Sequence, residues 1–313
     1  MTSAPAPTPP TDPRAAWDLP AFGSMARVAH LDEVVSRVLA PNPDPMTLDG
    51  TNTYLVGAPA TGAVAVIDPG PRDPEHLDRV REVVAARDAE VAAVLVTHHH
   101  HDHLAAAADW AARFGAPLHV TRPQDAAADA SATSDASATS DASGPDARVI
   151  ADGDVVRLPG CEIAAVATPG HTRDHVAYRL DHGPLLTGDH VLGRGTSVVA
   201  HPDGDLPAYL ESLRRVLELG PDALYPGHGP ALHEDPDAVV HFYLDHRDFR
   251  RQQVLAALAE GPHTPRGLVE RIYAAVDPRL WDAAEASTRA LLQGLVAEGT
   301  VDLDAHDRVH LRT

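Results

Sequence analysis

The 313-residue sequence has no lysine, a single cysteine and only 4% aromatic residues. Because Cys161 is alone, an internal disulfide and a thiolate zinc finger are both excluded, which fits the reducing cytoplasm. No run of 18 apolar residues exists and the N-terminus lacks the apolar core of a signal peptide, so we expect no membrane partner. We therefore predict a cytoplasmic protein in which histidine and carboxylate hold any metal.

The charge balance is strongly acidic, with 25 arginines against 45 acidic residues and a net charge of −20. Such a chain does not attract nucleic acid in general, so duplex DNA is not expected as a partner and a polynucleotide substrate would need a local arginine patch. The apolar content of 44% is ordinary for a globular protein. The length predicts one large domain, with room for a second, smaller one.

The order of elements indicates a layered α/β (α+β) architecture. Residues 1–24 form a proline-rich tail that we expect to be disordered, and residues 25–235 form the larger domain. In this domain, two runs of predicted strands are each followed by helices, which favours sheets packed inside helices. An Ala/Ser/Asp-rich stretch at residues 125–147 carries a tandem "ASATSD" and predicts a flexible insert.

The last segment, residues 236–313, has a different character. Its pattern predicts three helices followed by a strand, a polar turn and a strand, which is the order of a winged helix. The segment holds 9 arginines against 12 acidic residues, a net charge of −3. This is a poor electrostatic footprint for duplex DNA.

The most informative stretch is "VLVTHHHHDHLAA", residues 94–106, where a buried strand ends at Thr97 and delivers histidines into a loop. The pair Asp102–His103 sets the register and predicts His98 and His100 as further ligands. The chain has 20 histidines, so this spacing alone carries limited weight. Zinc binds imidazole and carboxylate well, with about four ligands for each ion.

Three isolated residues strengthen the prediction of a metal site. His171 lies in "TPGHTRDH", Asp189 in "LLTGDH" and His228 in "YPGHGP", and each follows a predicted strand on a glycine-containing loop. Together with the histidine run they supply five histidines and two aspartates. This set is sufficient for two metal ions that share one carboxylate.

The series T-H-x-H-x-D-H, G-H-T, G-D and G-H-G resembles the metallo-β-lactamase superfamily in order and spacing. The stretches "LDGTNTYLVG", "TPGHTRDHVAYRL", "GDHVLGRGTS" and "HRDFRRQQVL" are similar to the branch of β-lactamase-like proteins with a C-terminal winged helix, which includes an endoribonuclease. The resemblance implies an αββα sandwich with a C-terminal winged-helix subdomain.

The resemblance also implies roles for individual residues. Asp68 would orient a ligand histidine, His190 follows the bridging aspartate with its role open, and Asn52, Tyr54 and Arg194 would contact substrate. The first zinc ion would be held by His98, His100 and His171, the second by Asp102, His103 and His228, and Asp189 would bridge the two ions. His99 and His101 have no metal role and are expected to face solvent or a neighbouring group.

These features predict a dinuclear zinc hydrolase, in which a hydroxide between two ions attacks the substrate and Asp102 orients it and accepts its proton. No separate serine or cysteine nucleophile motif is present. The branch implies a phosphodiester of single-stranded RNA as substrate, and a cluster of Arg247, Arg250 and Arg251 would favour it. A thioester hydrolase of the glyoxalase-II or acyl-carrier type needs the same ligands. A metal-containing winged-helix regulator is a third alternative, and a homo-oligomer stays open.

Overall fold

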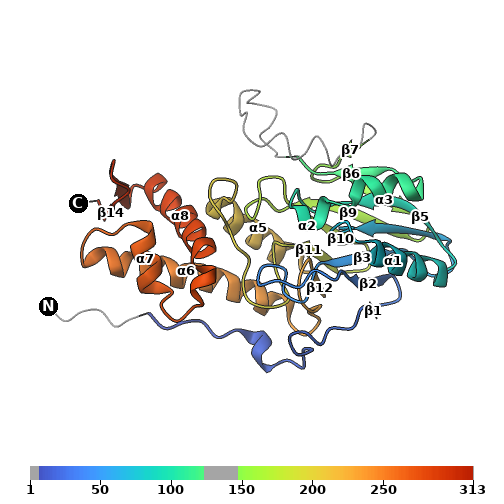
Figure 1. Ribbon diagram of the computed structural model, residues 1–313, viewed down its shortest axis with the longest axis horizontal. Helices are drawn as coiled ribbons and strands as arrows, with labels where there is room; N and C mark the ends of the chain where they lie inside the picture. The colour runs from blue at the N-terminus through green and yellow to red at the C-terminus, as the bar shows by residue number, and fades with distance from the viewer. Residues whose placement is uncertain (1–6, 123–146, 313) are drawn as a thin grey trace.

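The computed structural model describes residues 7–122 and 147–312. Within them, two mixed β-sheets stack face to face between layers of helices, and a helical part follows at the C-terminus (Figure 1). In spatial order, the first sheet contains β1 (Val28–His30), β2 (Val35–Leu39), β3 (Asn52–Val56), β4 (Ala63–Ile67), β5 (Glu90–Leu95), β6 (Leu118–Val120) and β7 (Arg148–Val149). The second contains β12 (Leu224–Pro226), β11 (Leu185–Gly188), β10 (Val176–Leu180), β9 (Cys161–Ala167) and β8 (Val155–Leu158).

The helices lie on the outer faces of the sandwich and in the C-terminal part. They are η1 (Pro13–Ala16), α1 (Pro74–Ala86), α2 (His101–Leu104), α3 (Ala107–Phe114), α5 (Leu206–Leu219), α6 (Pro236–Ala259), α7 (Pro265–Ile272), η2 (Pro278–Leu280) and α8 (Trp281–Ala297). A hairpin of β13 (Val301–Leu303) and β14 (Val309–Leu311) follows them. The αββα sandwich and the C-terminal winged helix predicted from the sequence are thus confirmed.

Alternation along the strands explains the layers. On β4, Val64 and Val66 point toward the helices α1 and α3, whereas Ala65 and Ile67 point toward the second sheet. Because successive side chains of a strand face opposite sides, a run that is apolar on both sides must be covered on both sides. The first sheet is therefore enclosed between helices and the second sheet.

Helix α1 begins and packs as its sequence predicts. The side chain of Asp73 accepts a hydrogen bond from the backbone N–H of His76, and Pro74 occupies the first helical position, where its missing N–H is not needed. Leu77 and Val80 are buried on one face of the helix against the first sheet. This helix covers the outer face of the first sheet, where it contacts β2 and β5.

The end of the histidine run and the chain after it form two short helices. α2 ends at Leu104 and α3 begins at Ala107. The carbonyl of Ala105 accepts from Nε of Arg72 at 2.8 Å, and the N–H of Ala106 donates to the carbonyl of Gly70 at 3.1 Å. These bonds to another segment replace the continuous helical ladder and tie the histidine loop to the end of β4.

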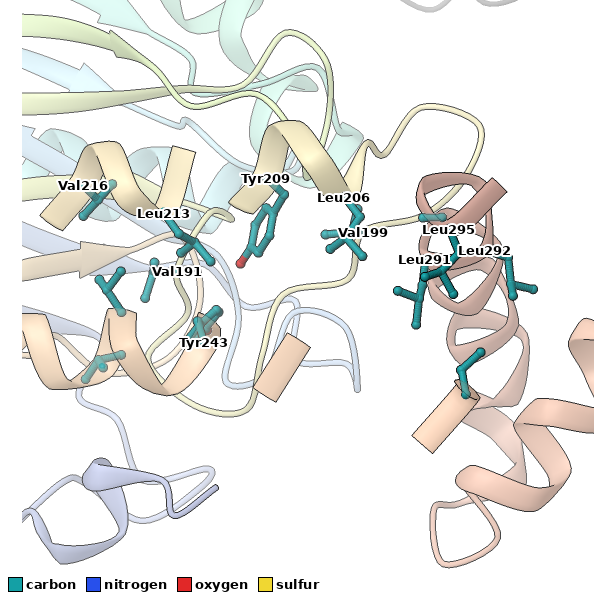
Figure 2. Close-up of a cluster of buried hydrophobic side chains, with 14 of the residues drawn as sticks. Val191, Val199, Leu206, Tyr209, Leu213, Val216, Tyr243, Leu291, Leu292 and Leu295 are labelled. Carbon is teal, nitrogen blue, oxygen red and sulfur yellow. The ribbon is translucent and has the colours of Figure 1, made fainter. Parts of the chain in front are cut away.

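The C-terminal helices share a core with the sandwich. Figure 2 shows Tyr209 and Leu213 of α5 close to Tyr243 of α6, and the leucines of α8 near Leu206. All of these side chains belong to one cluster that also includes residues of α7 and of both hairpin strands. The helix α6 thus contacts both the second sheet's helical layer and the winged helix.

The predicted disorder of residues 1–24 is corrected for the described part, residues 7–24. Its helix η1 packs on α6, and Arg14 is buried with only 5% exposure. The guanidinium of Arg14 donates to the carbonyls of Leu192 and Gly195, each at 2.7 Å, and pairs with Asp12. The composition of the tail did not predict that it is ordered, because one arginine makes the contacts that hold it.

The predicted flexible insert, residues 125–147, lies outside the described residues except for Ala147. In the described part of the chain, no helix is both long enough and apolar enough to cross a membrane.

Candidate metal centre

The seven predicted ligands are brought together at one edge of the sandwich by loops from different parts of the chain. The loop after β5, which runs into α2, carries four of them, and the loops after β9, β11 and β12 carry one each. The backbone N–H of Gly227 donates to the carbonyl of Gly188, and the N–H of Asn52 donates to the carbonyl of Gly227, so that the ends of β11 and β12 and the start of β3 are held side by side. The ligand atoms fall into two groups.

The first group consists of three imidazoles and one carboxylate. Nδ1 of His100 lies 3.0 Å from Nε2 of His98 and 3.1 Å from Nε2 of His171. Oδ2 of Asp189 lies 3.6 Å from Nε2 of His171. The four ligand atoms lie within 4.8 Å of one another.

The second group consists of Asp102, His103 and His228. Nε2 of His228 lies 3.1 Å from Oδ2 of Asp102 and 3.3 Å from Nε2 of His103. The other oxygen of Asp189, Oδ1, lies 3.4 Å from Nε2 of His228. Asp189 therefore presents one oxygen to each group, as the sequence prediction of a bridging carboxylate requires.

These distances fit metal ions of the zinc type. A tetrahedral ion with ligands at about 2.0–2.1 Å separates its donor atoms by about 3.3 Å, and the separations given above range from 3.0 to 3.6 Å. In addition, Oδ1 of Asp189 is buried and has no hydrogen-bond partner among the described residues. A buried carboxylate oxygen without a donor is costly unless a cation satisfies it. The donor set of imidazole nitrogen and carboxylate oxygen therefore fits a pair of such ions.

Burial keeps the imidazoles of the first group neutral. It lowers the pKa of His98 well below its usual value and that of His100 to about 3, and the neighbouring histidines add to the effect. A metal ligand must present a free lone pair, so these two rings are ready to bind at neutral pH.

In the second group, the neighbouring carboxylates favour the protonated, positively charged form of the imidazole. Burial alone would lower the pKa of His228, but the charge of Asp189 and the hydrogen bond with Asp102 outweigh it and raise this pKa to about 9. Burial would likewise raise the pKa of Asp102, but the charge of His103 and the hydrogen bond with His228 lower it. Both carboxylates are thus ionised at neutral pH, and a bound cation would displace a proton from His228.

The outward nitrogens of the ligand rings are held by oxygen atoms. Nδ1 of His103 donates to Oδ2 of Asp68 at 2.8 Å, and Nδ1 of His171 donates to the carbonyl of Val198 at 2.6 Å. Nδ1 of His228 lies 3.2 Å from the carbonyl of Gly50. Because Nδ1 is the donor in each bond, Nε2 is the nitrogen that faces the site and would bind a metal, and the bond fixes the orientation of the ring.

Asp68 has the position that the sequence predicts and contacts more than one partner. Its Oδ1 accepts from the backbone N–H of Thr97, and its Oδ2 accepts from the hydroxyl of Thr97, both at 2.8 Å. Because this hydroxyl hydrogen is used, the oxygen of Thr97 accepts from Nδ1 of His98 at 3.0 Å. One carboxylate therefore orients His103 directly and His98 through Thr97.

The sequence analysis did not identify His175 and Gly227 as site residues. Nε2 of His175 accepts from the backbone N–H of Asp189 at 3.1 Å, while its Nδ1 donates to the hydroxyl of Thr168. A Cβ atom on Gly227 would lie 2.6 Å from Oδ1 of Asp189, so only glycine fits there. The signal for His175 was its place four residues after His171, but a second histidine in a histidine-rich chain is not distinctive.

Two of the three predicted substrate contacts, Asn52 and Tyr54, differ from the expectation, whereas that of Arg194 stays a prediction. Asn52 is fully buried and donates to the carbonyls of Pro226 and Gly229, and the hydroxyl of Tyr54 donates to Pro226 at 2.7 Å. Both side chains hold the loop that carries His228, so they are not available to substrate. Arg194 is half-buried, and two of its guanidinium nitrogens have no partner among the described residues.

The remaining histidines of interest lie beside the ligands. His190 is buried, its ring packs on Tyr209 with the centroids 4.8 Å apart, and burial lowers its pKa to about 3. Neither of its ring nitrogens has a hydrogen-bond partner in the described structure, and it belongs to neither ligand group. His99 lies with Nδ1 at 2.8 Å from Oδ1 of Asp174, whereas His101 is exposed. A neighbouring group beside His99 and solvent around His101 are the surroundings expected for these two histidines.

Comparisons with known proteins agree with this geometry. The sequence profile described as "Metallo-beta-lactamase superfamily" matches residues 46–228, and the profile "Beta-lactamase associated winged helix domain" matches residues 264–308. The chain is 32% identical to "Beta-lactamase-like protein 2 homolog" of Drosophila melanogaster, over 87% of this chain and 91% of that protein. It is 35% identical to "Atrochrysone carboxyl ACP thioesterase" of Aspergillus chevalieri, over 72% of this chain and 66% of that protein. Among solved structures, a beta-lactamase domain protein from Burkholderia ambifaria aligns with a TM-score of 0.76 and 25% identity, covering 95% of this chain and 96% of that one.

Proposed function

Because the chain belongs to the metallo-β-lactamase superfamily, we propose that it is a hydrolase with two zinc ions that cleaves a thioester of the acyl-carrier type. The observation that carries the hydrolase proposal is the convergence of two ligand groups on the two oxygens of Asp189. Zinc ions held by these residues would lower the pKa of a bound water and polarise the substrate's carbonyl oxygen.

The residues of the chain suit direct attack by water. Asp102 has the most exposed ligand carboxylate, with 28% of its side chain accessible, and it is ionised at neutral pH. It can accept a hydrogen bond from the attacking water and then take its proton.

Neither Ser197 nor Cys161 is available as an alternative nucleophile. The hydroxyl of Ser197 donates to the carbonyls of Asp189 and His190, so it has a structural role. Cys161 is buried, and burial raises the pKa of its thiol to about 11.

Three observations favour a thioester over RNA. The Aspergillus chevalieri relative is named as a thioesterase acting on an acyl carrier, whereas the name of the Drosophila melanogaster relative states no substrate. The net charge of −20 also opposes a polyanionic substrate. Arg247 and Arg250, which would have supported RNA binding, are half-buried against aromatic rings, and Arg251 pairs with Glu298.

Cleavage of single-stranded RNA is the second candidate. It is supported by the lack of any carboxylate partner for Arg194, Arg247 and Arg250 among the ion pairs of the described residues. A guanidinium group whose charge no carboxylate neutralises is suited to bind phosphate.

The test offers both substrates to the same zinc-loaded protein: an acyl-pantetheine thioester and a fluorescent single-stranded RNA. We expect thioester hydrolysis that is lost in the double variant Asp102→Asn, His103→Asn and kept in Asp152→Asn, a matched change at an exposed ion pair with Arg215. RNA cleavage without thioester hydrolysis would reverse the ranking. A metal-loaded protein that cleaves neither substrate would contradict the hydrolase proposal.

A further inference from the structure

The segment after β11, residues 189–200, connects the metal centre with the helices that follow it. It begins at the bridging Asp189, contains no helix or strand, and most of its residues are buried. Because it lacks the hydrogen-bond ladder of a helix or strand, contacts with other elements must determine its course. Figure 2 shows Val191 of this segment close to Tyr209 of α5 and Tyr243 of α6, and all three belong to one apolar cluster.

This segment orients one of the metal ligands. Nδ1 of His171 donates to the carbonyl of Val198 at 2.6 Å, and this bond turns Nε2 of the ring toward the other ligands of the first group. By contrast, Nδ1 of His103 donates to Asp68, which directly follows a strand of the first sheet. The orientation of His171 therefore depends on how firmly the segment is held.

Arg247 of α6 holds the segment next to the orienting carbonyl. Its Nη2 donates to the carbonyl of Ser197 at 2.5 Å, and the hydroxyl of Ser197 donates to the carbonyls of Asp189 and His190. The guanidinium also lies over the ring of Tyr209, 5.0 Å from the centroid, and the hydroxyl of Tyr209 donates to the carbonyl of His190 at 2.6 Å. A charge-assisted hydrogen bond and a cation–π contact thus act together on one segment.

Other side chains hold the middle of the segment. Arg14 of the N-terminal tail donates to the carbonyl of Leu192, and the hydroxyl of Tyr243 accepts from the N–H of Leu192. Among the hydrogen bonds of the described residues, that of Arg247 is the one that ties residues 196–198 to a helix. The stretch that contains the orienting carbonyl is therefore held by α6 through one arginine.

We propose that Arg247 is a positioning residue for the first metal ion. By holding the carbonyl of Ser197 it fixes the next carbonyl, that of Val198, which orients His171. The ion of the first group therefore depends on a helix that lies outside the sandwich, whereas the ion of the second group does not. The inference rests on the two-zinc site of the proposed function and is independent of its substrate.

The test measures zinc affinity, by competition with a chelator, in two forms of the full-length chain that each keep one ligand group. Asp102→Asn, His103→Asn keeps the first group, and His98→Asn, His100→Asn keeps the second. In the first form, Arg247→Met should weaken zinc binding by about 10-fold, the lower end of the effect of losing an outer partner of a metal ligand. In the second form, the same substitution should leave the affinity unchanged.

Two further variants separate positioning from packing. Arg250→Met is the matched control on the same helix, because the guanidinium of Arg250 also lies over a ring, that of Tyr273 at 4.4 Å, but donates to Gln253. It should leave both affinities unchanged. Arg247→Lys retains a charged donor without the planar fork and should recover part of the lost affinity. If Arg247→Met does not fold, Arg247→Lys provides the test, with an expected affinity below that of the unsubstituted form.

A second measurement needs no metal. In the metal-free chain, the backbone amides of residues 189–200 should exchange their hydrogens faster in Arg247→Met than in the wild type, because the segment opens more often. Arg250→Met should exchange at the wild-type rate in these residues. Equal exchange in all three proteins would contradict the proposal.

The affinities decide the assignment. Unchanged zinc affinity of the first group in both Arg247 variants, an equal loss in Arg250→Met, or an equal loss in the two ligand groups would overturn the proposal. The last two results would show a general loosening of the structure. Because these measurements contain no substrate, a chain that binds zinc as expected and hydrolyses no thioester would contradict the proposed function and leave this inference standing.

Discussion

Replacing Asp68 by asparagine should weaken the second ligand group without removing any ligand. The carboxylate accepts three hydrogen bonds, two from Thr97 and one from Nδ1 of His103. An asparagine has one acceptor oxygen in place of two, so at least one of these donors loses its partner. If the amide oxygen keeps the backbone bond with Thr97, the amide nitrogen faces the imidazole donor of His103.

The magnitude follows from this geometry. A hydrogen bond to a charged group is worth about 1.5–3 kcal/mol, and loss of an oriented outer partner lowers metal affinity by about 10- to 100-fold. We therefore expect Asp68→Asn to fold and to keep the metal of the first group, while the second ion dissociates about 10- to 100-fold more readily. The unequal effect arises because His103 belongs to the second group and His98 is reached only through Thr97.

A chelator titration followed by metal analysis measures this directly. Asp152→Asn is the control, since it makes the same chemical change at an exposed ion pair away from the ligands. If Asp68→Asn retained both ions with wild-type affinity, the inference that Asp68 orients the ligand histidine would be refuted.

Three further outcomes are expected. Gly227→Ala should destabilise the folded protein by about 1–3 kcal/mol and impair metal binding, because its Cβ would lie 2.6 Å from Asp189 and 2.8 Å from His103. An unchanged midpoint of denaturation would count against this prediction. Burial lowers the pKa of His76 to about 4 in the folded chain. As the pH falls from about 6.5 to about 4, the unfolded state therefore binds a proton at this histidine before the folded state does. Over that pH range, the wild type should lose up to ~3 kcal/mol more stability than His76→Gln. Parallel stability curves for the two proteins would refute this assignment. Removal of metal with a chelator should lower the thermal midpoint, because the folded state loses the free energy of metal binding. This free energy is about 4 kcal/mol for an ion present at 1,000 times its dissociation constant. An unchanged midpoint would argue against bound metal.

Local patterns predicted sheets packed inside helices and single ligands on loops at strand ends, whereas the family resemblance implied the αββα sandwich and the division of the ligands between two ions. Strands with apolar residues on both sides, such as β4, must lie between two layers, and short glycine-containing loops after strands bring single ligands to one edge. His171, Asp189 and His228 could be chosen from the acidic and histidine-rich background because each follows a strand end. The structure places these three residues beside the histidine loop.

Other features depend on long-range contacts that no local pattern encodes. Arg14 of the proline-rich tail is buried because its guanidinium donates to the carbonyls of Leu192 and Gly195 and its helix, η1, packs on α6. Asn52 and Tyr54 were expected at the substrate, but they bond to a loop more than 170 positions away in the sequence. Such partners are determined by the packing of the two sheets and could only be found in three dimensions.

The most direct test of the account is the metal content of the purified wild-type chain and of the variant Asp102→Asn, His103→Asn. The two ligand groups predict about two zinc ions per wild-type chain and about one in the variant, in which His98, His100, His171 and Asp189 are intact. A wild-type chain that binds no metal when zinc is supplied, or a variant with the same content as the wild type, would contradict the assignment of the two groups.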